Sequence, residues 1–284
     1  MQESSKNLII INVASFVMSF SALFAQWISL ESYSIIFGRS LTATPLLILA
    51  CLVMGAVQKI QSKTHGILIF ISGILITSHW VFFYMAIQVS SVAIGVISLF
   101  SYPLITSLIE PVFTKVKFQV RTLISSLILV LGIGILSGHN LVQGSLVLGI
   151  GLGIVAAVSF AIRNIIMKKI VHSYSPVWLM CLQTALSLVI LTPFSMTSFF
   201  NASSQNILLT ISVGVVVIAF AHTLFVQSMR TLSATSVGII ASLQLVYSVL
   251  SSWYFLNEPI SIHIIIGGFL IMAVAILEQF KTNT

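Results

Sequence analysis

Two stretches of this sequence, "HWVFFYMAIQVSSVAIGVI" (residues 79–97) and "HTLFVQSMRTLSATSVGII" (residues 222–240), align without a gap. The identical pairs are His79 with His222, Phe82 with Phe225, Ser90 with Ser233, Gly95 with Gly238, and Ile97 with Ile240. The offset of 143 residues is close to half of the 284-residue chain. We therefore predict an internal duplication, with one repeat in residues 1–140 and a second repeat in residues 141–284.

The composition indicates that both repeats lie in a lipid bilayer. Hydrophobic residues make up 58% of the chain and charged residues only 6%, whereas soluble domains carry about 25% charged residues. A soluble core cannot absorb so much apolar surface, so we predict an all-α integral membrane protein. The net charge of +7 does not indicate nucleic-acid binding, because the basic residues are scattered between apolar runs.

Ten segments are long and apolar enough to cross the membrane, since a spanning helix needs about 20 such residues. They are residues 8–29, 33–57, 66–87, 90–113, 119–137, 145–168, 176–199, 206–229, 233–256 and 262–279. Basic residues near the segment ends all fall on one side: Lys6, Lys59, Lys63, Lys115, Lys117, Arg121, Lys168, Lys169, Arg230 and Lys281. By the positive-inside rule this side, with both termini, is expected to be cytoplasmic.

The two repeats are expected to have opposite orientations, because each contains an odd number of spans. The connections agree with this expectation: "FTKVKF" (113–118) is basic and falls on the inner side, whereas its counterpart "LNEPIS" (256–261) contains Glu258 and falls on the outer side. Inverted repeats are a recurrent plan of secondary transporters, which bind substrate at the repeat interface. We therefore predict ten transmembrane helices arranged as two five-helix inverted repeats.

The chain resembles the drug/metabolite transporter superfamily and, within it, the EamA-type transporters. The resemblance is carried by "LSATSVGIIASLQLVYSVLSSWYFLNEPISIHIIIGGFLIMAVAIL" (232–277), "FGRS" (37–40) and "SYPL" (101–104). The sequence departs from the family at Lys115, where many relatives carry Glu, and at Val246, which replaces the span-4 Pro in the second repeat. The resemblance implies that spans 1–4 and 6–9 surround a central cavity. It also implies that spans 5 and 10 pack at the periphery or between the protomers of a homodimer.

Polar side chains at helical spacing mark helix faces that should avoid lipid. Small polar residues at such positions often serve helix packing, whereas larger polar and aromatic side chains favour a cavity wall. In the first span, Asn12, Ser19 and Gln26 share one face. The candidates for substrate binding are Asn12, Ser19, Gln26, Arg39, His79, Trp80, Tyr84, Tyr102, Gln183, His222, Gln244 and Tyr247.

Two arginines fall inside predicted spans. A charge at the bilayer centre costs about 2.5–3.5 kcal/mol on insertion scales. Arg39 either snorkels to the nearby outer interface or pairs with an anionic substrate group or a helix C-terminus. Arg163 lies near the inner end of its span, and we expect it to snorkel toward Lys168 and Lys169.

The two repeat-related histidines leave two alternatives open. His79 and His222 are either neutral rings hydrogen-bonded between helices or groups that contact substrate or carry protons, since histidine titrates near physiological pH. Trp80 and Tyr84 place aromatic surface next to His79. Glu110, near the inner end of the fourth span, is expected to be an interface residue rather than a proton carrier.

The sequence therefore predicts a secondary transporter of a small metabolite, such as an amino acid, a nucleotide-like metabolite or an amphipathic compound. We expect an exporter or exchanger that works by alternating access in the bacterial inner (plasma) membrane. A non-transporting scaffold or a channel is the alternative, although a channel usually has charged rings or a filter loop. No enzyme is expected, because the five acidic residues form no cluster with metal ligands or a nucleophile. We expect no cofactor or metal; the expected partners are the solute, the bilayer and a second protomer, but no nucleic acid.

Overall fold

The computed structural model describes residues 2–90, 92–137, 145–256 and 260–283, and within them every regular element is a helix. The helices of the first half are α1 (Gln2–Trp27), α2 (Ser32–Val53), α3 (Lys63–Val89), α4 (Val92–Leu99), α5 (Tyr102–Phe113) and α6 (Val120–Ser137). Those of the second half are α7 (Leu146–Ile170), α8 (Pro176–Phe200), α9 (Ser204–Val213), η1 (Gly214–Ala221), α10 (His222–Ser228), α11 (Ala234–Ala241), α12 (Leu243–Leu256) and α13 (Ile262–Asn283). Glu258, used above for the inversion argument, lies outside the described residues.

These elements form ten membrane spans. The pairs α4–α5 and α11–α12 each make one broken span, and α9, η1 and α10 together make another. Among the described residues, eight helical segments have the length and mean hydropathy of a spanning helix, and two shorter apolar helices lie at residues Ser5–Ser21 and Val120–Ile135. The prediction of an all-α protein that spans the membrane many times is confirmed.

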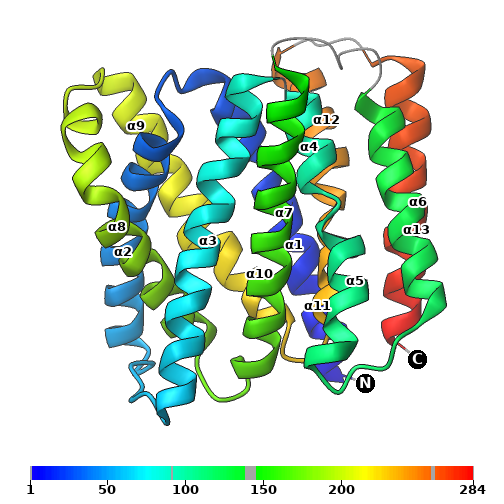
Figure 1. Cartoon of the computed structure of the whole chain (residues 1–284), viewed down its shortest axis with the longest axis horizontal. Coiled ribbons are helices and arrows are strands. Elements are labelled where there is room, and N and C mark those ends of the chain that lie inside the picture. Colours follow the sequence, from blue (N-terminus) through cyan, green and yellow to red (C-terminus); the bar gives the residue numbers. More distant parts are fainter. Residues whose placement is uncertain (1, 91, 138–144, 257–259, 284) are drawn as a thin grey trace.

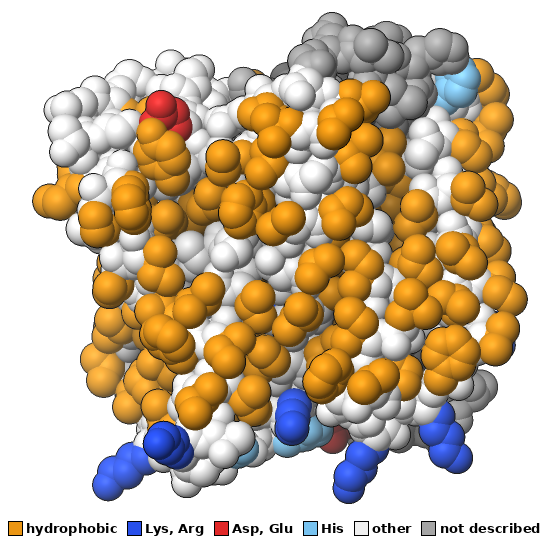
Figure 2. All heavy atoms as spheres, viewed as in Figure 1, with side chains coloured by type: hydrophobic (Ala, Val, Ile, Leu, Met, Phe, Trp, Pro, Cys, Tyr) orange, Lys and Arg blue, Asp and Glu red, His pale blue; other side chains and the backbone are white. Residues whose placement is uncertain are grey.

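The two halves run in opposite directions through the bundle. Both termini lie at the same end of the molecule, and α7, which begins the second half, starts at the other end (Figure 1). The connections that carry Lys59, Lys115, Lys117 and Arg230 lie at the end of the termini, which we call the basic end. Figure 2 shows Lys and Arg side chains along this end and hydrophobic side chains over the middle of the visible face.

Helices of one half pack against helices of the other half throughout the bundle. α3 packs on α7, α2 on α8, and α1 on α12, so that much of the buried core lies between the repeats. α6 and α13, the fifth and tenth spans, pack on each other at one edge of the bundle (Figure 1). The eight other spans therefore remain to enclose any central space.

The broken spans have different local causes in the two halves. In the first half, Pro103 has no amide hydrogen to donate to the carbonyl of Leu99, and the helix is interrupted there. In the second half the break at Ser242 occurs without proline. There the hydroxyl and the amide of Ser242 both donate to the carbonyl of Ile239, at 2.6 and 3.2 Å, which competes with regular helical bonding.

The eighth span contains a π-helical segment, η1, directly before His222. Its first residue, Gly214, lies against α2, where a Cβ atom would come 2.8 Å from the carbonyl oxygen of Arg39. The equivalent span of the first half, α3, is a continuous α-helix. π-helical segments are frequent at functional sites. Because η1 contacts Arg39 at its first residue and ends directly before His222, these two residues are candidates for a functional site.

Candidate functional site

A cavity of about 240 Å³ lies between the two repeats. Its wall is built by α1, α2, α3, α4 and α5 of the first half and by α7, η1, α10 and α12 of the second half. Seven of the sequence-predicted residues line it: Arg39, His79, Trp80, Tyr84, Tyr102, His222 and Gln244. The structure thus brings together the larger part of the predicted set, from five different spans.

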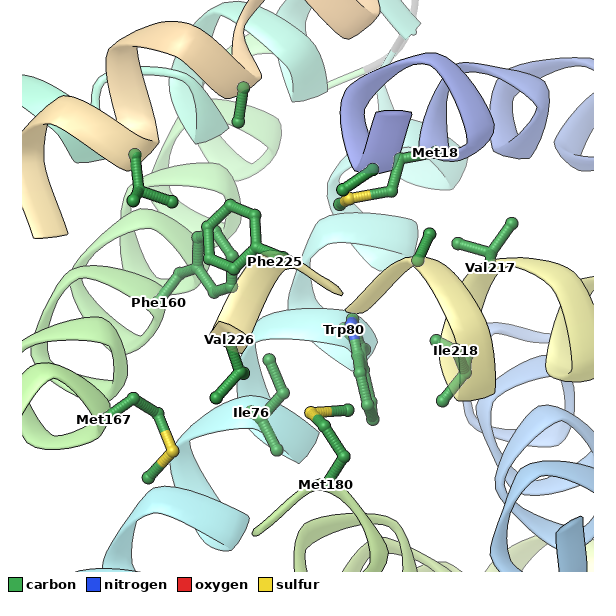
Figure 3. Packing of buried hydrophobic residues seen from close by; sticks show 14 of the residues in the cluster. Met18, Ile76, Trp80, Phe160, Met167, Met180, Val217, Ile218, Phe225 and Val226 are labelled. Carbon is green, nitrogen blue, oxygen red and sulfur yellow. The ribbon is translucent and has the colours of Figure 1, made fainter. Parts of the chain in front are cut away.

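The cavity extends toward the end of the molecule opposite the basic end. Its wall includes Ile87, two residues before α3 ends there, but reaches no deeper toward the basic end than the level of His79 and His222. One turn beyond these histidines, Ile76 and Val226 are completely buried. Figure 3 shows these two side chains together with those of Met167 and Met180, and the four come from four different helices. The sulfur atoms of Met167 and Met180 accept from Gln183 Nε2 at 3.0 Å and from Arg163 Nη2 at 3.2 Å. We call these four residues the apolar plug.

Arg39 is buried in the cavity wall and does not snorkel, since only 3% of the residue is exposed. One guanidinium nitrogen, Nη1, donates to the hydroxyl oxygen of Tyr84 at 3.1 Å, and the guanidinium carbon lies 5.5 Å from the centre of that ring. The Nε atom has no hydrogen-bond partner among the described residues. A buried donor of this kind is costly unless a ligand accepts from it.

The two histidines occupy different environments despite their relation by the repeat. The His79 ring stacks on Phe160 with centroids 4.1 Å apart, and its Nδ1 lies 3.2 Å from the carbonyl oxygen of Ala156. Because a carbonyl only accepts, this hydrogen bond requires the proton on Nδ1. The Nδ1 of His222 has no partner within the described part of the chain, and its ring meets that of Trp80 edge-on at 5.4 Å. His79 is therefore a packed ring whose Nδ1 is used, whereas His222 is a wall residue whose buried Nδ1 has no partner within the described part of the chain.

Trp80 and Tyr102 add aromatic walls at the same depth. Trp80 is 97% buried, and its Nε1 has no acceptor among the residues that the structure describes. Tyr102 already uses its hydroxyl, which donates to the carbonyl oxygen of Gly238 at 3.2 Å, and its ring packs edge-on against Phe160. Of these two side chains, Trp80 is the one with a donor left for a ligand.

Four predicted residues lie elsewhere, and the side chain of the fifth, Gln26, is outside the described residues. Asn12 donates to the carbonyl oxygen of Leu8 and to Gln279 at 3.2 Å, which connects α1 to α13. The Ser19 hydroxyl donates within its own helix, and the Tyr247 ring packs edge-on against Phe16. None of these three, nor Gln183, lines the cavity. The polar stripe of the first span thus serves helix contacts at these positions.

Arg163 corrects a further expectation, because it is fully buried and does not reach the basic end. Its Nε and Nη2 donate to the side-chain oxygen of Gln183 at 3.2 and 2.6 Å, and Nη1 donates to Asn164 at 3.1 Å. Gln183 in turn donates to the Ser72 hydroxyl at 2.9 Å. This network joins α7, α8 and α3 at the level of the apolar plug, so Arg163 and Gln183 hold the two repeats together.

Glu110 is buried between the two halves, with only 1% of its surface exposed. Its carboxylate accepts from the amides of Ala234 and Thr235 at 2.7 and 3.0 Å and from the Thr235 hydroxyl at 2.6 Å. A carboxylate at this position satisfies the free amides of the α11 N-terminus and complements the helix dipole. Glu110 therefore attaches α5 of the first half to α11 of the second half at the basic end, beside a polar hollow of about 220 Å³.

Sequence reasoning missed several residues of the cavity wall. Phe160, Met18 and Val217 are apolar and carry no periodic signal that separates them from ordinary packing residues. Ser21 also lines the cavity, although it lies off the polar stripe that was predicted for the first span. The available sequence signal for Phe160 was its position one turn before Arg163, a charged residue inside a predicted span.

Comparison with known proteins identifies the family. The profile described as "EamA-like transporter family" matches residues 5–138 and again residues 147–277, so it covers both halves. The chain belongs to the EamA-like transporter family. This family is part of the drug/metabolite transporter superfamily, and the protein is accordingly an integral membrane transporter.

One curated relative supports the assignment, and one solved structure shares the fold. The protein is 30% identical over 226 residues to "Uncharacterized transporter YxxF" of Bacillus subtilis (strain 168), covering 78% of this chain and 72% of the relative. A solved structure titled "Crystal structure of protein" superposes with a TM-score of 0.81 over 98% of this chain and 99% of the other, at 16% identity. That likeness concerns the fold. Membership of the family points to transport and away from enzyme activity.

Proposed function

We propose that this EamA-family protein is a secondary transporter that exports or exchanges a small metabolite by alternating access. The observation that carries the proposal is the cavity at the repeat interface, which extends toward one end of the bundle and is closed toward the other by the apolar plug. A cavity with one exposed end can deliver a solute only if a second conformation exposes it to the other end. Rocking of inverted repeats provides that conformation in other transporters.

The proposed cavity suits a small solute better than a lipid or a peptide. Its volume of about 240 Å³ lies just below the range of about 300–1,000 Å³ that is usual for drug-sized ligands. An amino acid, a nucleotide-like metabolite or a compact amphipathic compound is of suitable size. The energy for transport would come from the gradient of the solute itself, of a counter-solute or of an ion.

The proposed orientation places the basic end in the cytoplasm. The exposed residues Lys59, Lys63, Lys115 and Lys117 lie at this end. In bacterial membranes such asymmetry retains the basic connections inside. Both termini would then be cytoplasmic in the bacterial inner (plasma) membrane, and the cavity would face outward.

Counterflow in proteoliposomes tests the proposal. Vesicles that contain the purified protein are preloaded with a metabolite pool, and uptake of each radiolabelled member is compared with uptake by protein-free vesicles. Saturable uptake that is accelerated by internal solute supports a carrier. Flux that rises linearly with concentration indicates a channel, and folded protein without any protein-dependent flux indicates a scaffold; either result contradicts the proposal.

A cysteine variant tests whether solute passes through this cavity. Ser21 lines the cavity, whereas the native Cys51 and Cys181 are buried. A membrane-impermeant thiol reagent added to the outside of cells should block flux by Ser21→Cys and leave the wild-type protein unaffected. Undiminished flux by the fully labelled variant would exclude this cavity as the route.

A further inference from the structure

The charges around the cavity are all of one sign. The five acidic residues of the chain are Glu3, Glu31, Glu110, Glu258 and Glu278, and none of the four that the structure describes lines the cavity. Arg39 lies in its wall, and Arg163 is buried one turn beyond the wall residue Phe160. In a bundle surrounded by lipid, charges act through a lower effective dielectric constant than in water. The cavity therefore has a positive potential that favours an anion.

Three residues of the cavity wall each carry a buried nitrogen atom without a hydrogen-bond partner among the described residues. Arg39 Nε, Trp80 Nε1 and His222 Nδ1 have no hydrogen-bond partner among the described residues, and each of these residues is 97% buried. Arginine and tryptophan side chains can only donate hydrogen bonds. A solute that completes this set must present acceptor atoms, and a carboxylate offers several acceptors together with the charge that complements Arg39.

The remainder of the wall is apolar and largely aromatic. Phe83, Phe100 and Phe160 line the cavity together with the rings of Tyr84 and Tyr102. Aromatic walls hold a flat apolar group through edge and face contacts, which add to the burial of its surface. The acceptor-seeking nitrogens and the aromatic walls thus fit opposite parts of one small amphipathic molecule.

We infer that the transported solute is a small organic monoanion with a flat apolar body, and that Arg39 binds its anionic group. This inference rests on the proposed transport function and specifies the charge class of the solute. A cation is opposed by Arg39 and Arg163. A zwitterion would have to place its ammonium group in the same positive field, where the neutral oxygens of Ser21, Ser248 and Gln244 are the side-chain acceptors of the wall outside the aromatic rings.

A series of four probes on one ring scaffold tests the charge class. Phenylpropionate is the anion, phenylpropionamide the neutral analogue, phenylalanine the zwitterion and phenethylamine the cation. Dissociation constants are measured on the purified full-length protein from the concentration dependence of its thermal unfolding midpoint. We expect phenylpropionate to bind at least about tenfold more tightly than each of the other three, which corresponds to about 1.4 kcal/mol.

A variant identifies the residue that responds to the charge. Arg39→Gln should raise the dissociation constant of phenylpropionate about tenfold and leave that of phenylpropionamide unchanged. Arg121→Gln, at an exposed position of α6, is the matched control and should change neither constant. If Arg39→Gln does not fold, the charge class is decided by the order of the four dissociation constants measured on the wild-type protein.

Three results would overturn the inference: no binding of phenylpropionate, equal or tighter binding of phenylalanine or phenethylamine, or an equal loss of anion and amide binding in Arg39→Gln. The transport proposal is tested separately, by the counterflow of the metabolite pool into proteoliposomes. A carrier that moves cationic or zwitterionic members of that pool would keep the transport function and refute the charge class.

Discussion

The two buried arginines of this transporter solve the same physical problem in different ways. Each places a guanidinium group in a membrane-spanning helix with 3% or less of the residue exposed. Arg163 gives hydrogen bonds to Gln183 and Asn164 through Nε, Nη1 and Nη2. Arg39 gives its bond to Tyr84, and its Nε has no partner among the described residues.

This difference in hydrogen bonding distinguishes an arginine that stabilises the fold from an arginine that can bind a solute. The cost of inserting Arg163 is offset within the folded chain, so this residue holds α7 and α8 together. The cost of inserting Arg39 is offset only in part, and the remainder is available to a solute that brings acceptor atoms into the cavity. A charged residue inside a span therefore indicates a site only when its hydrogen-bonding groups are incompletely used.

The largest effect is expected for the stability of Arg163→Ala. This change removes the network and leaves the oxygens of Gln183 and Asn164 without their donor, so the free energy of unfolding should fall by about 3 kcal/mol. Arg39→Ala, the matched control, should lose about 1 kcal/mol. Denaturant unfolding in mixed micelles measures both, and equal losses would show that the comparison is mistaken.

Transport by Arg39→Gln is expected to show the next largest effect. Loss of a charge-assisted contact to solute worth about 2 kcal/mol lowers kcat/KM for the carried solute about thirtyfold. Initial rates of counterflow measure this ratio, with exposed Arg121→Gln as control. A wild-type ratio in a folded Arg39→Gln protein would remove Arg39 from the binding site.

A smaller effect is expected for Trp80→Phe, which retains an aromatic ring and removes the Nε1 donor. We expect KM to rise about fivefold, as for the loss of one neutral hydrogen bond of about 1 kcal/mol. Trp178→Phe is a matched control: the Trp178 Nε1 also lacks a partner among the described residues, but this residue does not line the cavity. Equal changes of KM in both variants would contradict a specific contact by Trp80.

The smallest effect is expected for Asn12→Ala. The sequence suggested a cavity residue, but the side chain bonds to Leu8 and Gln279. KM should remain within twofold of the wild-type value, while the free energy of unfolding should fall by about 0.5–1 kcal/mol. A marked rise of KM with unchanged stability would restore Asn12 to the site.

The spans and their inversion could be predicted because hydropathy and basic connections are local features of the sequence. No break was predicted in the fourth span, although Pro103 is a local signal for one. The break at Ser242 and the π-helical segment before His222 have no such signal, since neither contains a proline. The first involves a serine that bonds to its own helix, and the second lies against another helix. Local pattern alone therefore recovers the spans but not their irregularities.

The site was predicted only in part, because a periodic pattern shows which face of a helix is polar and not what that face meets. Gln183 and Arg163 are 20 residues apart on different helices, and only the folded bundle reveals that they satisfy each other. Arg39, Trp80 and His222 belong to three different spans, and only the folded bundle places them in the wall of one cavity.

The attachment of α11 by Glu110 has a consequence for any inward-facing conformation. The carboxylate belongs to one repeat and the amides of Ala234 and Thr235 belong to the other. Separation of the repeats at the basic end would therefore leave the carboxylate and both amides without their hydrogen-bond partners. Only water can take over these bonds in the absence of a new protein partner. Release toward the cytoplasm would then require water to enter between the repeats. The rate at which water enters would limit how often the inward-facing conformation forms.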